Sequence, residues 1–221
     1  SAVRQVAESC AELGVKYLTL YAFSTENWNR PQLEVSALMT LLLKTINAEL
    51  KTLLKNDIRL GAIGDIDSLP KNVAKELRET IAKTAGGKRM ELILALSYGG
   101  KNEIVRAIKQ IALKVQNKEI GLHEINEQLI SNNLYTAGRP DPELLIRTSG
   151  EKRVSNFLLW QLAYAEFYFT GITLRICLRL TVLHFCAVFF RFVRFYLFQC
   201  IRYHIAGYDY ETVFFGVGKC V

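Results

Sequence analysis

The stretch Asp141–Thr170 holds the side chains best suited to chemistry in this chain. Arg147 and Arg153 follow a short apolar run and lie in a loop rich in glycine and hydroxyl groups, which ends near Ser155. A guanidinium group can bind two phosphate oxygens at once, and free backbone amides at the end of a strand favour the same kind of ligand. These residue types and their spacing therefore predict a phosphate or diphosphate site.

A carboxylate follows the same loop. Glu166 precedes the apolar run 167–169, and its oxygens could hold a Mg²⁺ ion that bridges to phosphate oxygens. The alternative is that Arg147, Glu151 and Arg153 form a solvated ion-pair cluster, with Glu166 an ordinary charge at the end of a helix.

A second polar loop, residues 24–31, combines Ser24, Asn27 and Arg30 with the aromatic ring of Trp28. A hydroxyl, an amide and a guanidinium beside an aromatic face suit a polar ligand that carries an apolar appendage. The alternative is structural: Trp28 would fill a surface gap, and Arg30 would be a charge at the start of the next helix.

Apolar periodicity predicts the elements that must position these loops. Helices are expected at 2–13, 33–56, 70–84, 102–116, near 123–130 and directly after Ser155-Asn156, which would serve as the N-cap of that last helix. Strands are expected at 17–23, 58–63, 91–96, 144–146 and 166–169.

This alternation predicts an α/β fold: a single domain with a mostly parallel central sheet flanked by helices. A chain of 221 residues, half of them hydrophobic, can bury one such core. In parallel sheets the loops at the carboxyl ends of the strands form the site. Those loops here are 24–31, 64–65, 97–100 and 147–155.

Charge and composition divide the chain near residue 170. The net charge is +7, and residues 171–221 carry +4 of it together with eight of the twelve phenylalanines and four of the five cysteines. The rest of the chain shows no basic stripe, which argues against nucleic acid as a partner. The cysteines lack metal-ligand spacing, and reduced thiols in the cytoplasm are expected.

Four motifs together resemble those of the cis-prenyltransferase family: Tyr21–Pro31, Ile63–Asp65, Tyr98–Gly100 and Ile146–Gln161. The likeness covers residues 1 to about 170 in order. It implies an undecaprenyl diphosphate synthase-like fold with a hydrophobic tunnel, for which the helix at 33–56 and the strand at 91–96 would supply leucine-rich walls. A leucine stripe of this kind is also common in an ordinary core.

The resemblance implies Z-selective, Mg²⁺-dependent prenyl chain elongation, in which isopentenyl diphosphate condenses onto farnesyl diphosphate to give undecaprenyl diphosphate. By the same resemblance, Asn27 corresponds to the proton acceptor and Glu166 to a Mg²⁺ ligand. Because a neutral amide is a weak base, Asn27 could instead position a proton relay. Substrate-binding roles are implied for Ser24, Thr25, Glu26, Trp28, Arg30, Arg147, Arg153, Val154 and Ser155.

The chain departs from the family pattern at two places. The family's opening Met-Asp-Gly-Asn-Gly-Arg-Trp-Ala motif is absent, so little or no activity is expected of this polypeptide. Residues 171–221 have no resemblance to the family, which suggests a frameshifted tail that is disordered or poorly packed. One alternative is a non-catalytic cis-prenyltransferase-like subunit. Another is a protein that binds diphosphate or a membrane surface through this tail.

The resemblance also implies a homodimer, with the apolar segment Phe157–Phe169 contributing to the interface. A cytoplasmic location, peripheral at the membrane that receives the product, is expected.

Overall fold

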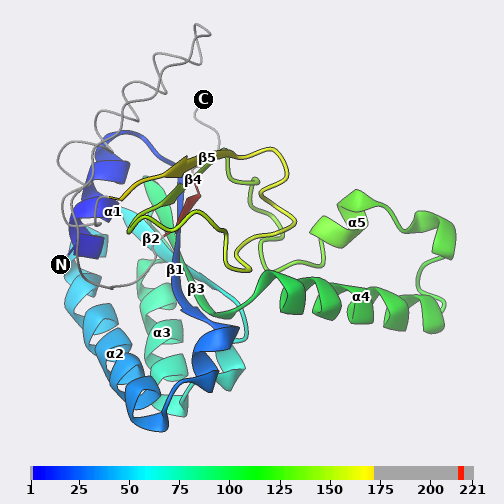
Figure 1. Ribbon diagram of the computed structural model, residues 1–221, viewed down its shortest axis with the longest axis horizontal. Coiled ribbons are helices and arrows are strands. Elements are labelled where there is room, and N and C mark those ends of the chain that lie inside the picture. The colour runs from blue at the N-terminus through cyan, green and yellow to red at the C-terminus, as the bar shows by residue number, and fades with distance from the viewer. Residues whose placement is uncertain (1, 172–213, 217–221) are drawn as a thin grey trace, which may run out of the picture.

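The computed structural model describes residues 2–171 and 214–216 and confirms the α/β architecture (Figure 1). Three parallel strands form one sheet in the order β1-β3-β2, and three further strands form a second sheet in the order β5-β4-β6. β4 and β5 are parallel, whereas β6 runs antiparallel to β4. The strands are β1 (Tyr17–Ser24), β2 (Ile58–Ile63), β3 (Met90–Tyr98), β4 (Leu144–Arg147), β5 (Glu166–Phe169) and β6 (Phe214–Gly216).

Helices cover the first sheet on one side. α2 and α3 lie next to each other over β2, while α4 leaves the carboxyl end of β3 and runs away from the sheet, with α5 beside it (Figure 1). The helices are α1 (Ala2–Glu12), α2 (Gln32–Lys55), α3 (Lys71–Thr84), α4 (Gly100–Gln116) and α5 (Glu127–Ser131). These boundaries match the apolar periodicity to within about two residues, except at the start of α5.

Burial explains why β3 forms the centre of the sheet. All nine of its residues are buried, as its nearly continuous apolar sequence predicts for a strand covered on both faces. One side of the sheet packs against α1, α2 and α3, and the other packs against the segment that contains Phe157 and Leu158. The sheet is therefore packed on both faces up to the carboxyl ends that present the polar loops.

The helix expected after Ser155-Asn156 is absent, and that prediction was wrong. Residues 155–164 form a series of turns, because Ser155, Asn156 and Leu158 all adopt left-handed backbone conformations that no α-helix can include. Phe157 and Leu158 are instead buried individually, with the ring of Phe157 stacked on Tyr21 at 4.6 Å between centroids. Tertiary packing here overrides the local helical pattern.

Of the region 171–221, the structure describes Gly171 and β6. The backbone of β6 pairs with β4 and lies beside β1, so it joins the two sheets. Phe214–Gly216 therefore form a strand within a region that was expected to be disordered or poorly packed, and that expectation stays a prediction. For 172–213 and 217–221 it lies outside the described residues, as does the proposed frameshift. Within the described part of the chain, no helix has the length and apolar character needed to cross a membrane.

Candidate functional site

Arg147 is the last residue of β4, and its guanidinium is a buried charge at the carboxyl edge of the second sheet. Only 3% of it is exposed. Its Nη1 donates to Ser155 Oγ at 2.8 Å and to the backbone carbonyl of Arg153. Burial, together with the positive charge of Arg153, lowers the pKa of the Arg147 guanidinium, which nevertheless stays protonated at neutral pH. A buried cation is thus held in a fixed orientation at the start of the loop.

Arg153 differs from Arg147 in its exposure. Its side chain is 68% exposed and forms an ion pair with Glu151, which also lies 3.9 Å from Arg147 Nη2. Val154 is half-buried and packs against the apolar cluster around Phe157. Because exposed ion pairs contribute little stability, Arg153 can leave Glu151 for an anionic ligand at small cost.

The loop after β1 forms the 3-10 helix η1 (Thr25–Asn29). The Ser24 backbone amide donates to Asn27 Oδ1 at 2.8 Å, which holds the Asn27 side chain against the end of the strand. Trp28 is half-buried, and its Nε1 donates to Ser97 Oγ at 2.9 Å while its ring lies edge-on to Phe23. Arg30 is exposed and lies 3.7 Å from Glu34 on the first turn of α2.

The Glu26 carboxylate connects this loop to the next one. Asn156 Nδ2 donates to Glu26 Oε1 at 2.7 Å, and Thr25 Oγ1 lies 3.3 Å from the other carboxylate oxygen. Burial alone would raise the pKa of Glu26, but the hydrogen bonds from Asn156, its own backbone amide, Ser24 and Thr25 outweigh that effect and lower it. The carboxylate is therefore held in its charged form.

The part that two residues play at this edge was not predicted from the sequence: Ser97, in the expected loop 97–100, received no role, and Asn156 was expected only as part of the N-cap of a helix that does not form. Ser97 has a φ of 46° at the end of β3 and bonds both Trp28 and Ser68, so it ties the loops after β1 and β2 together. Asn156 bonds Glu26 and the start of α4. The sequence shows a polar residue at each of these two positions, but the tertiary fold determines which residues each of them bonds.

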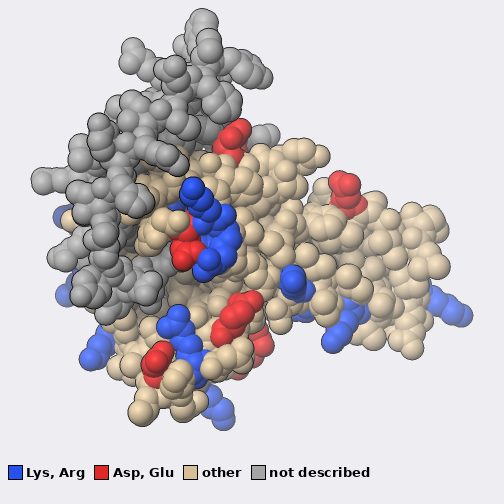
Figure 2. Space-filling view, viewed as in Figure 1, with Lys and Arg blue, Asp and Glu red and all other residues tan. Residues whose placement is uncertain are grey.

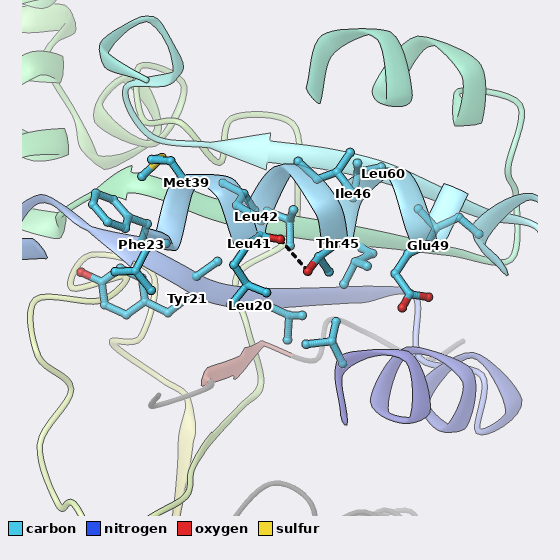
Figure 3. A pocket seen from close by; sticks show the side chains of 16 residues that line it. Leu20, Tyr21, Phe23, Met39, Leu41, Leu42, Thr45, Ile46, Glu49 and Leu60 are labelled. Atoms are coloured by element: carbon cyan, nitrogen blue, oxygen red, sulfur yellow. Dashed lines mark hydrogen bonds between the residues drawn. The ribbon is translucent and has the colours of Figure 1, made fainter. Parts of the chain in front are cut away.

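An apolar cavity of about 160 Å³ lies between α2 and the face of the first sheet (Figure 3). Tyr21 and Phe23 line one end near the polar loops, and Glu49 lies at the other end near α1, where it bonds Arg4 Nε at 2.7 Å. Leucines dominate the wall, namely Leu20, Leu38, Leu41, Leu42, Leu53, Leu60, Leu92 and Leu94. Helix α2 and strand β3 thus line an apolar space, although with far less free volume than a long hydrocarbon needs.

Glu166 lies apart from these loops. It is exposed and begins β5, where it pairs with Leu144, whereas Arg147 pairs with Phe169 at the far end of the two parallel strands. Three residues of strand separate the two positions by about 10 Å. Among the described residues, no three His, Cys, Asp or Glu side chains gather in a way that could hold a metal. A single exposed carboxylate does not make a Mg²⁺ site by itself.

The fold and the site together define a class of protein. Four loops meet at one edge of an α/β sheet, with a buried arginine, hydroxyls and amides among them, and an apolar cavity begins beside the same strand ends. On the face shown in Figure 2, basic and acidic side chains alternate and form no broad patch of one sign. Such a molecule suits a ligand with a small anionic head and an apolar body.

Comparison with known proteins gives this class a family. Residues 1–175 match the prenyltransferase model described as "Putative undecaprenyl diphosphate synthase". An isoprenyl transferase of Clostridium tetani is 48% identical over 170 residues, covering 77% of this chain and 67% of that protein. A Vibrio parahaemolyticus protein named ditrans,polycis-undecaprenyl-diphosphate synthase, (2E,6E)-farnesyl-diphosphate specific, is 47% identical over 170 residues, covering 77% of this chain and 68% of its own length.

A solved structure agrees with the sequence matches. Lavandulyl diphosphate synthase from Lavandula x intermedia, in complex with dimethylallyl diphosphate, has a TM-score of 0.79 and 34% identity, covering 85% of this chain and 81% of the plant protein. The chain belongs to the cis-prenyltransferase family. It spans about two thirds of the length of the two bacterial relatives.

Proposed function

We propose that the protein to which this chain belongs elongates a prenyl chain by condensing isopentenyl diphosphate onto farnesyl diphosphate to give undecaprenyl diphosphate. One observation carries the proposal. Tyr21 and Phe23 line the apolar cavity, and Ser24, directly after them, begins the polar loop that Asn156 links to the Arg147 loop. A single strand end therefore serves both the head and the tail of a prenyl diphosphate.

The choice of substrates follows from the family and from the chemistry of the loops. The name of the Vibrio parahaemolyticus relative specifies farnesyl diphosphate, and the structural neighbour holds another allylic diphosphate. Departure of diphosphate from an allylic carbon develops negative charge, which fixed guanidinium and amide donors stabilise. Arg147 and Ser155, with the mobile charge of Arg153, are proposed to hold a diphosphate, and Ser24–Trp28 and Arg30 to contact the second substrate.

Asn27 remains the proposed participant in proton transfer, as a residue that positions a proton relay. Its Oδ1 already accepts the Ser24 amide hydrogen, which leaves the Nδ2 hydrogens to face a ligand or water. A neutral amide held in this way is suited to position a proton relay rather than to act as a strong base.

Mg²⁺ is part of the proposal as an ion that arrives with the substrate. It prefers one or two carboxylates together with diphosphate oxygens and water, which a diphosphate bound near these loops would provide. Glu166 is retained as a proposed ligand, although its place at the start of β5 lies about 10 Å along the strands from Arg147. Titration of Mg²⁺ into wild-type and Glu166→Gln protein, with and without isopentenyl diphosphate, tests both statements.

Direct binding tests the proposed function without relying on turnover. Calorimetric titration with isopentenyl diphosphate and with a non-hydrolysable farnesyl diphosphate analogue should give saturable binding of each. Inorganic phosphate and farnesol, which carry only part of the recognised features, should bind at least tenfold more weakly. If farnesol binds as tightly as its diphosphate, the polar loops do not recognise the head group and the proposal fails.

A further inference from the structure

Asn156 occupies the place where three segments of the site meet. Its φ is 62°, a left-handed conformation that asparagine tolerates better than most residues. Its Oδ1 accepts the backbone amide hydrogen of Lys101 at 2.8 Å, and its own carbonyl accepts that of Gly100 at 2.6 Å. Its Nδ2 donates to Glu26 at 2.7 Å. One side chain thus contacts both the first turn of α4 and the loop after β1.

This arrangement needs an amide. A carboxylate could accept from the start of α4, but it has no hydrogen to donate to the charged Glu26. A hydroxyl can accept and donate, but through a single oxygen, whereas the amide does so through two separate atoms. The surroundings are tight: a Cβ on Gly99 would lie 2.5 Å from Thr25 Oγ1 and 2.8 Å from Asn156 Nδ2. The three segments therefore lie in close contact at the junction.

We propose that Asn156 is a positioning residue, which couples the loop 147–155 to the loop 24–30 through Glu26 and so fixes the distance between the two halves of the site. The proposal rests on the proposed function only in taking these loops to bind a diphosphate. The simpler role for Asn156 is that of a helix cap for α4. The two roles use different atoms of the amide, so they can be separated by mutation.

Asn156→Asp keeps an acceptor for the Lys101 amide but replaces the donor to Glu26 with a repelling carboxylate. Glu26→Gln in the same chain restores a donor and acceptor pair with the roles exchanged. The single variant Glu26→Gln completes the cycle. Asn126→Asp is the matched control, because Asn126 Oδ1 caps α5 by accepting from Leu129 at 2.9 Å and lies away from the site.

Two measurements read the coupling. The first is the Kd for isopentenyl diphosphate, and the second is hydrogen exchange of the backbone amides of residues 25–30 without ligand. We expect Asn156→Asp to weaken binding about tenfold or more and to speed the exchange of those amides, because a hydrogen bond to a charged group is lost. The double variant should recover to within about threefold of wild type, and Asn126→Asp should match wild type.

Wild-type binding and exchange in Asn156→Asp would overturn the proposal, as would a double variant no better than the single one. Failure of the wild-type chain to bind isopentenyl diphosphate would instead reject the proposed function. In that case hydrogen exchange alone decides the coupling: unchanged protection of residues 25–30 in Asn156→Asp would reject it, and loss of protection that Glu26→Gln restores would support it.

Discussion

At the scale of single residues, the site depends on buried or anchored polar groups rather than on the number of charges. Arg147 is held by Ser155 and the carbonyl of Arg153, and the sheet excludes water from most of its guanidinium. Arg30 and Arg153, by contrast, are exposed and free to rearrange around a ligand. In the proposed function the fixed arginine would set where the diphosphate lies, and the exposed ones would add attraction.

Arg147→Lys should separate charge from geometry. A lysine retains the positive charge but cannot hold Ser155 and a diphosphate at the same time through a planar fork. We expect the affinity for isopentenyl diphosphate to fall by about 10- to 100-fold, as for the loss of charge-assisted hydrogen bonds. Arg78→Lys, which changes an exposed pair with Asp67, should leave calorimetric Kd values unchanged. Equal affinities of Arg147→Lys and wild type would mean that the orientation of the guanidinium is unimportant.

The lowered pKa of Glu26 makes a prediction about stability and pH. A carboxyl whose pKa is lower in the folded state stabilises that state above its ordinary pKa of 4.5, and loses this contribution as the pH falls through its folded value. Wild type should therefore be more stable than Glu26→Gln at pH 7, and this difference should shrink below about pH 4.5. Urea unfolding at several pH values measures it. If the difference in unfolding free energy between wild type and Glu26→Gln grew on acidification, the hydrogen bonds would not stabilise the charged form of Glu26.

At the scale of elements, β1 and α2 bring the apolar cavity to the polar edge. The side chain of Phe23 faces the cavity, and the next residues turn away from the sheet as η1 (Figure 3). Within α2, the Thr45 hydroxyl that lines the cavity donates to the Leu41 carbonyl at 2.9 Å, so its polarity is satisfied inside the helix. The cavity therefore offers a hydrocarbon few competing polar groups.

Leu42→Trp should fill this cavity. The larger ring would occupy much of the space of about 160 Å³ and block an apolar chain, at a cost of about 1–3 kcal/mol in unfolding free energy if the core must shift. We expect binding of the farnesyl analogue to weaken at least tenfold while isopentenyl diphosphate binds as in wild type. Leu54→Trp, at an exposed position of the same helix, is the control. Unaltered binding of the farnesyl analogue would place the hydrocarbon elsewhere.

Sequence patterns predicted most of these elements because local periodicity and burial agree in them. β2 matches its expected range at both ends, and α3 begins directly after Pro70 as proline at a helix start predicts. The segment after Ser155 could not be predicted in this way. Its conformation depends on Asn156 bonding α4 and Glu26, and on Phe157 stacking with Tyr21, and these partners are 55, 130 and 136 residues away in the chain.

The position of Glu166 illustrates a different limit. The sequence placed it correctly at the start of a strand, and the start of a parallel strand lies opposite the edge where the carboxyl-end loops meet. The family resemblance assigns a role to Glu166, but it does not say how far the residue lies from the other site residues in the folded chain. The role of Glu166 as a Mg²⁺ ligand stays a prediction, which the metal titration of Glu166→Gln tests.

At the scale of the whole molecule, two exposed aromatic rings near the start of β5 give the described part of the chain an apolar surface. Tyr164 is 98% exposed and Phe167 is 48% exposed, whereas Phe157 of the same segment is fully buried. If the proposed homodimer uses the segment Phe157–Phe169, only its later part is available for contact. Exposed aromatic rings of this kind are enriched in protein interfaces.

Analytical ultracentrifugation tests that surface. We expect the wild-type chain to sediment as a dimer, and Tyr164→Asp combined with Phe167→Asp to shift it to a monomer without loss of secondary structure. Val105→Asp together with Ile108→Asp, on the exposed face of α4, should leave the dimer intact. If Tyr164→Asp combined with Phe167→Asp still sediments as a dimer, the interface lies on another face.

The central claim is that one ligand spans the polar loop after β1 and the α2 cavity, and photo-crosslinking tests it most directly. A farnesyl diphosphate analogue with a diazirine at its far isoprene unit would be irradiated with the protein and the adducts mapped by mass spectrometry. The account predicts adducts on cavity residues such as Leu42 and Ile46, strongly reduced in Arg30→Ala. Adducts on the exposed face of α4, or labelling of the cavity that Arg30→Ala leaves unchanged, would contradict it.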